Sequence, residues 1–128
     1  GESSAGIWLQ KPMKDFKKLL IWQKGMEIVD KAYDLAHEFP KEELYGLRSQ
    51  LTRSAVGIPA NIAEGSAKSS QRDYARYLEI SLGSSFELET LTEVARRRNW
   101  GSKKQVEELL ECIVEEQRML QSFIKKVS

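Results

Sequence analysis

The apolar side chains between residues 44 and 62 recur at steps of three and four, and the pattern passes Pro59 without a change of phase. This spacing marks one face of an α-helix. A proline inside a helix removes one backbone donor and crowds the carbonyl four residues back, at a cost of roughly 3 kcal/mol. We therefore predict one helix, over about residues 42–67, that bends at Pro59 instead of breaking there. Its apolar positions are Leu44, Leu47, Leu51, Ala55, Ile58 and Ile62.

Three further segments carry a helical period, over about residues 18–39, 71–99 and 103–127. Pro40 ends the first, and Ser70 and Ser102 are suited to cap the other two. No segment alternates as a strand does. Four long helices with short connections predict an all-α, antiparallel up-down four-helix bundle with a proline-bent second helix. The expected core face of the first helix is Leu19, Trp22, Met26, Val29, Tyr33 and Ala36.

The chain of 128 residues has the length of one domain. Residues 1–12 show no period and precede Met13, so we interpret them as a vector-derived or disordered leader and residues 13–128 as the bundle.

Charge and composition narrow the function classes. The chain has 20 Lys and Arg against 19 Asp and Glu, one cysteine (Cys112) and one histidine (His37). A single thiol forms no internal disulfide, and one histidine with one cysteine forms no zinc cluster. No apolar run reaches the ~18 residues that a membrane span needs. We expect a cytoplasmic protein with no membrane association, no cofactor and no metal.

The candidate nucleophiles are Ser54, Ser84, Ser85 and Cys112, and each would need a positioned base. His37 falls at a helix end, where it fits a helix-dipole role better than a catalytic one. A Glu-x-x-His metal motif is absent from the sequence. We therefore expect no enzyme and no catalytic residue.

Asn61 and Glu64 lie three residues apart on one face of the helix that holds Pro59. They could bind a ligand or partner at the bend. Alternatively, with a basic residue such as Arg53 or Arg76, they could form an internal polar network that satisfies the backbone opened by the proline. We favour the network, because buried polar groups usually have partners of their own.

Cations gather at one predicted end of the bundle. In an up-down bundle, the start of the first helix, the end of the second, the start of the third and the end of the fourth share a pole. Clustered cations, more than net charge, are what phosphate contacts require. This predicts a nucleic-acid surface formed by Lys14, Lys17, Lys18, Lys68, Arg72, Arg76, Lys125 and Lys126.

The first helix carries a second apolar stripe at a seven-residue step, formed by Ile21, Ile28 and Leu35. This stripe could widen the core contact or meet another subunit. We favour the subunit contact, and with it a homo-oligomer.

Several blocks of the sequence together carry a family resemblance. They are Trp22-Gln23, Phe39-Pro40, Glu43-x-Tyr45-Gly46-Leu47, Gln50-Leu51-x-Arg53-Ser54-Ala55-Val56, Ile58-Pro59-Ala60-Asn61-Ile62-Ala63-Glu64-Gly65 and Gly83-Ser84-Ser85-Phe86-Glu87-Leu88-Glu89-Thr90. With these blocks the chain resembles the S23 family, the proteins encoded within intervening sequences of bacterial 23S ribosomal RNA genes. The resemblance runs from about residue 14 to 124 and implies a four-helix bundle without an agreed catalytic site, often a homo-oligomer, with a pentamer favoured. More remotely, the chain is similar to the accessory variability determinant of diversity-generating retroelements, which implies nucleic acid and a reverse transcriptase as partners. Gly57 and Ala60 depart from the family pattern, where serine is expected.

These observations predict a non-enzymatic homo-oligomeric bundle that binds RNA or DNA, or a ribonucleoprotein, as an adaptor through its basic end. The alternative is a protein–protein scaffold that binds no nucleic acid. A third hypothesis is a ligand binder or cryptic enzyme that uses Asn61 and Glu64.

Overall fold

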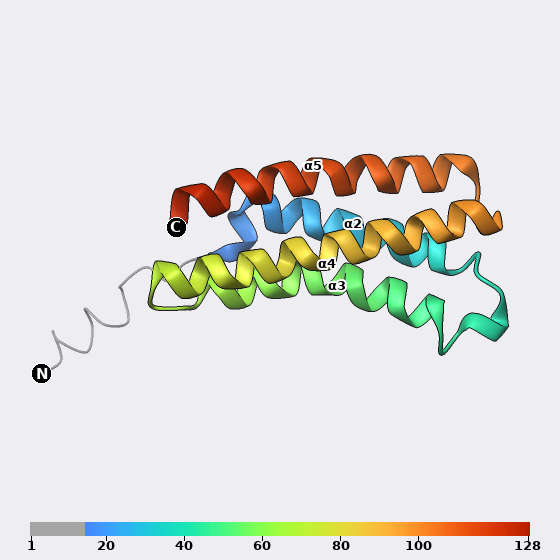
Figure 1. Cartoon of the computed structure of the whole chain (residues 1–128), viewed down its shortest axis with the longest axis horizontal. Helices are drawn as coiled ribbons and strands as arrows, with labels where there is room; N and C mark the ends of the chain where they lie inside the picture. Colours follow the sequence, from blue (N-terminus) through green and yellow to red (C-terminus); the bar gives the residue numbers. More distant parts are fainter. Residues whose placement is uncertain (1–14) are drawn as a thin grey trace, which may run out of the picture.

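The computed structural model describes residues 15–128, and within this range it contains four α-helices and no strand. The predicted leader over residues 1–12 and the predicted phosphate-binding Lys14 lie outside the described residues. Two 3₁₀ turns, η1 and η2, precede the first and second helices (Figure 1). The elements in chain order are η1 (Phe16–Lys18), α2 (Leu20–Ala36), η2 (Lys41–Glu43), α3 (Leu47–Ser66), α4 (Gln71–Arg98) and α5 (Lys103–Val127).

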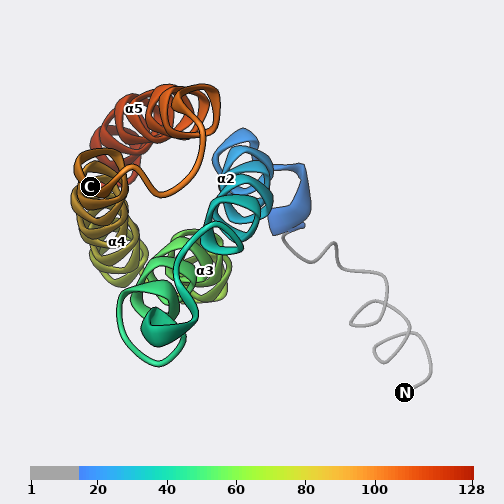
Figure 2. The same cartoon turned by 90° about the vertical axis from the view of Figure 1, so that its right-hand side faces the viewer.

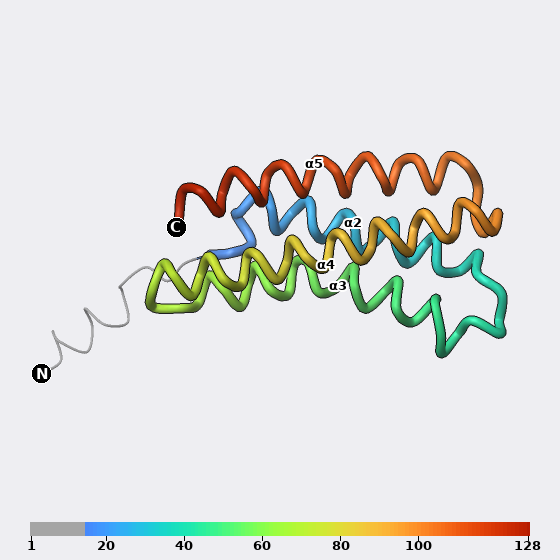
Figure 3. Tube along the Cα trace, viewed as in Figure 1, coloured from blue at the N-terminus to red at the C-terminus, as the bar shows by residue number. Residues whose placement is uncertain are grey.

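The four helices form a closed ring in which each packs against two others: α2 against α3 and α5, and α4 against α3 and α5. The view along the bundle shows this ring end-on (Figure 2). The Cα trace shows that the start of α2, the end of α3, the start of α4 and the end of α5 lie at the same end of the molecule (Figure 3). The chain is therefore an all-α bundle, as the sequence predicts.

The helix ends follow local chemistry. The Ser70 hydroxyl caps α4 by accepting from the Asp73 N–H at 3.1 Å, and Ser102 forms a reciprocal capping box with Gln105. Asn99 ends α4 in the left-handed conformation, at φ 60°. The start predicted for the second helix, near residue 42, was wrong, since α3 begins only at Leu47.

Glu43 explains the late start of α3. Its carboxylate accepts from the Leu47 N–H at 3.3 Å, so this side chain satisfies one of the unpaired donors in the first turn of α3. A residue used as a cap lies outside the helix that it caps.

Helix α3 continues through Pro59 without a break, which confirms the predicted continuity of this helix. The bend at Pro59 stays a prediction.

The face of α2 that enters the core differs from the expected one. Ile21, Ile28 and Leu35 are buried inside the single chain, so the prediction that this stripe meets another subunit was wrong. Met26 and Tyr33, which were expected in the core, are instead 39% and 47% exposed.

Small residues explain which face of α2 turns inward. Gly25 and Ala32 are buried and continue the step of three and four set by Ile21, Ile28 and Leu35. A Cβ atom on Gly25 would lie 3.3 Å from Cβ and Cδ of Pro59, so α2 and α3 touch at this glycine. Because the two backbones approach so closely at Gly25, this face of α2 is the buried one. Glycine and alanine contribute little to an apolar pattern, so the pattern read from the sequence pointed to a different face.

Small residues also bring α3 against α4. A Cβ on Gly57 would lie 2.9 Å from the Ser84 hydroxyl, and one on Gly65 would lie 2.7 Å from the Tyr77 Cβ. The Ser81 hydroxyl donates to the Ile58 carbonyl at 2.8 Å across the same contact. Gly57 and Ser84 are therefore in contact, whereas Gly83 has no neighbour within 4 Å of a Cβ at that position.

Gly65→Ala should lower the free energy of unfolding by about 1–2 kcal/mol, measured by urea denaturation. Alanine improves helix propensity by up to about 1 kcal/mol, but the added methyl group would overlap Tyr77 and force α3 and α4 apart. Gly83→Ala is the matched control, because its methyl group would meet open space and should stabilise the chain by up to about 1 kcal/mol. Equal stabilisation by both variants would contradict the close contact at Gly65.

Candidate functional site

The described part of the predicted cation cluster does gather at one end of the bundle, which we call the basic pole. Its members come from four separate elements: η1, the turn after α3, the first turns of α4 and the last turn of α5. All are exposed except one, Lys68, which is half-buried. The basic pole consists of Lys17, Lys18, Lys68, Arg72, Arg76, Lys125 and Lys126.

Few carboxylates neutralise the basic pole. In the same end turns the acidic side chains are Asp15, Glu64 and Asp73. Arg76 lies 3.9 Å from Asp73, and no other cation of the basic pole lies within 4.0 Å of a carboxylate oxygen of residues 15–128. At the opposite end of the bundle, cations do pair with carboxylates. The pairs there are Arg96 with Glu93, and Lys103 with Glu107.

Helix dipoles explain only part of this cluster. Lys125 and Lys126 lie in the last turn of α5, where the negative end of the dipole stabilises a cation. Lys18 precedes the start of α2 and Arg72 is the second residue of α4, so both lie at positive helix ends. Cations there weaken the helix slightly, by a few tenths of a kcal/mol. Helix stability therefore gives no reason for these two positions.

Tyr77 supports two cations of the basic pole. The Lys68 ammonium lies 4.8 Å and the Arg76 guanidinium 4.9 Å from the centre of its ring. Cation–π contacts of this kind orient the two side chains without neutralising them. Tyr77 is half-buried, while Tyr74 is buried against Phe123 with ring centres 5.7 Å apart. Tyr74 is therefore a core residue, whereas Tyr77 lies at the edge of the core and contacts the two cations.

The polar network predicted around Pro59 does not form. The Asn61 amide donates to the Gly57 carbonyl at 2.7 Å, within its own helix. Glu64 is exposed, and Arg53 is exposed with its guanidinium 3.5 Å from the Ser49 hydroxyl. Arg53 and Glu64 are eleven residues apart on the helix, about 16 Å along its axis, so their charged groups are too far apart to pair over the bend. Among the described residues, no hydrogen bond or ion pair joins Glu64 to Asn61 or to Arg76. This prediction was wrong.

The polar group that does lie beside Pro59 is Glu116, from the middle of α5. Its side chain is fully buried, and neither carboxyl oxygen has a hydrogen-bond partner in residues 15–128. A Cβ on Gly25 would lie 3.2 Å from one of these oxygens, so the missing side chain at Gly25 makes room for the acid. Sequence reasoning missed Glu116, although it continues the three-and-four step of Leu109, Ile113 and Leu120.

The candidate nucleophiles lie in inert surroundings. The hydroxyls of Ser54 and Ser85 donate to carbonyls one turn back in their own helices, and Ser84 faces Gly57. Burial, together with a hydrogen bond from the thiol to Glu27 at 3.3 Å, raises the pKa of Cys112 to about 11. The thiol therefore stays protonated near neutral pH.

His37, the single histidine, is exposed at the end of α2, where its ring nitrogen lies 3.3 Å from the Arg48 guanidinium. Over residues 15–128, no three His, Cys, Asp or Glu side chains are grouped so as to hold a metal ion. None of the helices in that range combines the length and the apolar character that crossing a membrane requires.

Comparison with known proteins places the chain in a family. The family model described as 23S rRNA-intervening sequence protein matches residues 17–122. The chain belongs to this family. A similar crystal structure is that of a protein of unknown function from the S23 ribosomal protein family of Bacteroides thetaiotaomicron, with 25% sequence identity and a TM-score of 0.76 over 83% of this chain and 99% of that one. No curated protein matches the sequence.

Membership of the 23S rRNA-intervening sequence family confirms the resemblance inferred from the sequence blocks. The block from Ile58 to Gly65 contributes buried residues to the core of α3, including Pro59 against Gly25 and Gly65 against Tyr77. These contacts give the block a packing role. None of the cations of the basic pole belongs to this block.

Glu116→Gln should change how stability depends on pH. Burial raises the pKa of Glu116 from 4.5 to about 8, against a smaller opposing effect of Lys24. The unfolded chain releases this proton near pH 4.5 and the folded chain keeps it to about pH 8, so the contribution of Glu116 to stability is lost as pH rises through this window. Relative to the wild type, the variant should gain up to about 1.4 kcal/mol per pH unit, measured by urea unfolding from pH 5 to 8.

Glu111→Gln is the control for this measurement, because Glu111 lies on the exposed face of the same helix. Its difference from the wild type should stay constant over the same pH range. A constant difference for Glu116→Gln as well would contradict a buried, neutral carboxylic acid.

Proposed function

We propose that this chain is a non-enzymatic, cytoplasmic, homo-oligomeric bundle that binds RNA or DNA through the basic pole and acts as an adaptor in a nucleoprotein assembly. The support is the concentration of seven described cations at one end of a chain whose net charge is only +1. Phosphate binding depends on such local clustering.

One observation carries this proposal: Lys18 and Arg72 lie at helix starts, where the dipole disfavours a cation and no carboxylate of the described residues pairs with them. An anionic partner would remove the repulsion among these side chains. It would also meet the positive ends of α2 and α4, which attract phosphate. Lys125 and Lys126 on α5 extend the same surface.

The oligomeric state and the protein partner in this proposal are supported by family resemblance. The resemblance to the S23 family favours a pentamer, and the remoter resemblance to retroelement accessory proteins, inferred from the sequence blocks, would make a reverse transcriptase the protein partner. In such an assembly, the basic poles of several copies would present a larger positive surface than one copy does, and multivalent contact with one nucleic acid raises the overall affinity.

Replacing Lys17, Lys18, Arg72, Lys125 and Lys126 together by glutamine should weaken the binding of a structured RNA and of duplex DNA by at least about tenfold at 0.1 M salt. Electrophoretic mobility shifts and a salt titration measure this. Each phosphate contact contributes about 0.7–0.9 to the slope of log K against log salt, so the slope should fall as well.

The control carries the same loss of charge at the opposite end: Lys41, Arg97, Arg98, Lys103 and Lys104 replaced by glutamine. It should retain most of the affinity. No binding by the wild-type chain at low salt, or an equal loss in both variants, would contradict a role for the basic pole.

A second candidate function is a protein–protein scaffold without nucleic acid, and the surface of α2 favours it. Met26 and Tyr33, seven residues apart, leave 39% and 47% of their surface exposed, with Trp22 and Val29 half-buried in the same three-and-four step. An apolar stripe on the outside of a bundle suits contact with a second copy or another protein. This surface replaces the stripe expected from the sequence at Ile21, Ile28 and Leu35.

Tyr33→Glu should reduce the mass of the assembly in solution, measured by light scattering, because a charge would be buried in the contact. Tyr45→Glu is the matched control, since Tyr45 is 93% exposed and lies in the turn before α3. A wild-type monomer, or an assembly that Tyr33→Glu leaves unchanged, would rule out self-association through this stripe.

A further inference from the structure

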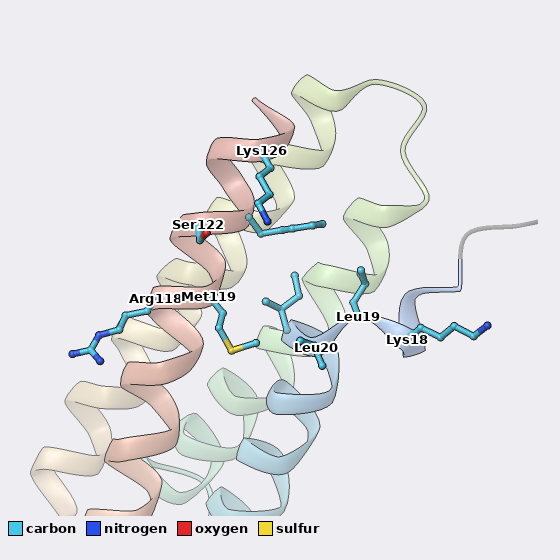
Figure 4. Close-up of a pocket in the computed structure, with 9 residues that line it drawn as sticks. Lys18, Leu19, Leu20, Arg118, Met119, Ser122 and Lys126 are labelled. Carbon is cyan, nitrogen blue, oxygen red and sulfur yellow. The ribbon is translucent and has the colours of Figure 1, made fainter.

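A groove opens beside the basic pole, between the start of α2 and the last turns of α5 (Figure 4). It has a volume of about 540 Å³, within the range of pockets that hold small molecules or parts of larger ligands. Apolar side chains make up most of its surface. Its lining residues are Lys18, Leu19, Leu20, Ile21, Arg118, Met119, Ser122, Phe123 and Lys126.

The charged side chains around this groove are all positive. Lys18 borders it from the α2 side, and Arg118 and Lys126 border it from α5. None of the lining residues is acidic. Arg118 and Lys126 are eight residues apart on one helix, which places their backbones about 12 Å apart along the axis. The groove therefore combines an apolar floor with cations at its edges: Lys126 points toward the groove, whereas Lys18 and Arg118 extend outward on opposite sides of it (Figure 4).

This combination restricts what the groove can hold. An acyl carboxylate or another ligand with one anionic group would match one cation and leave two without a counterpart. A ligand with repeated negative charges and apolar surfaces between them matches all three. A nucleic-acid strand has this pattern, since its phosphates are regularly spaced and every base has an apolar face.

We infer that the groove holds unpaired bases of a single-stranded RNA or DNA segment, with the neighbouring phosphates on Lys18, Arg118 and Lys126. This inference rests on the proposed function and adds to it a preference for single-stranded over double-stranded nucleic acid. In a duplex the bases are stacked inside and only phosphates would reach the groove, so Leu20 and Met119 would stay uncovered. Leu20 is 70% exposed, so a base that covers it would remove apolar surface from water.

The test compares three fluorescent 12-nucleotide probes by anisotropy at one salt concentration: a single strand, a fully abasic single strand and a duplex. The abasic strand keeps the phosphates and lacks the bases. We expect the wild-type chain to bind the single strand at least about tenfold more tightly than the abasic strand, because the bases can cover apolar side chains of the groove, among them the Phe123 ring. Leu20→Ser should remove most of this difference and leave binding of the abasic strand unchanged.

Leu44→Ser is the matched control, because Leu44 is 43% exposed in the turn at the opposite end of the bundle. It should leave all three affinities as in the wild type. Equal binding of the single strand and the abasic strand would overturn the inference while the proposed function stands, since the phosphates would still bind. No binding of any probe would overturn both. A change in mass for Leu20→Ser with the base-dependent difference intact would assign the groove to a second copy of the chain and overturn the inference.

Discussion

The contact of Gly25 with Pro59 determines how closely α2 and α3 approach, and much of the bundle depends on it. A side chain at residue 25 would press on the proline ring and on the Glu116 carboxyl group at once. Because glycine leaves this space open, α2 turns Ile21, Ile28 and Leu35 toward the core. The same orientation leaves Met26 and Tyr33 outside. One small residue therefore decides which face of the helix is core and which is surface.

The order in which the helices run up and down the bundle determines at which end each charged side chain lies. Consecutive elements meet at alternate ends of the bundle, so cations that lie far apart in the sequence gather at one pole, while carboxylates pair with cations at the other. A net charge of +1 conceals this polarity. The groove beside the basic pole adds an apolar surface to the cations, so a nucleic-acid strand bound as proposed would contact both features at one end of the bundle.

The sequence predicts the elements of this fold well and the orientation of individual helices less well. The four helices, the family and the gathering of Lys17, Arg72 and Lys125 follow from periodicity, sequence blocks and connectivity. The buried face of α2 does not, because Gly25 and Ala32 act through the space that they leave. The groove also could not be predicted from the sequence, because Leu20 and Met119 come together only when α2 and α5 pack.

Glu116 shows how a charged residue type can occupy a core as a neutral group. Its position against Gly25 excludes water from the carboxyl group, which therefore keeps its proton well above the pH at which a solvated glutamate loses it. Near neutral pH, unfolding must expose this group and release the proton to the solvent. The heat of unfolding then includes the heat of ionisation of the buffer that accepts the proton, so the bundle should show different unfolding enthalpies in phosphate and in amine buffers at the same pH.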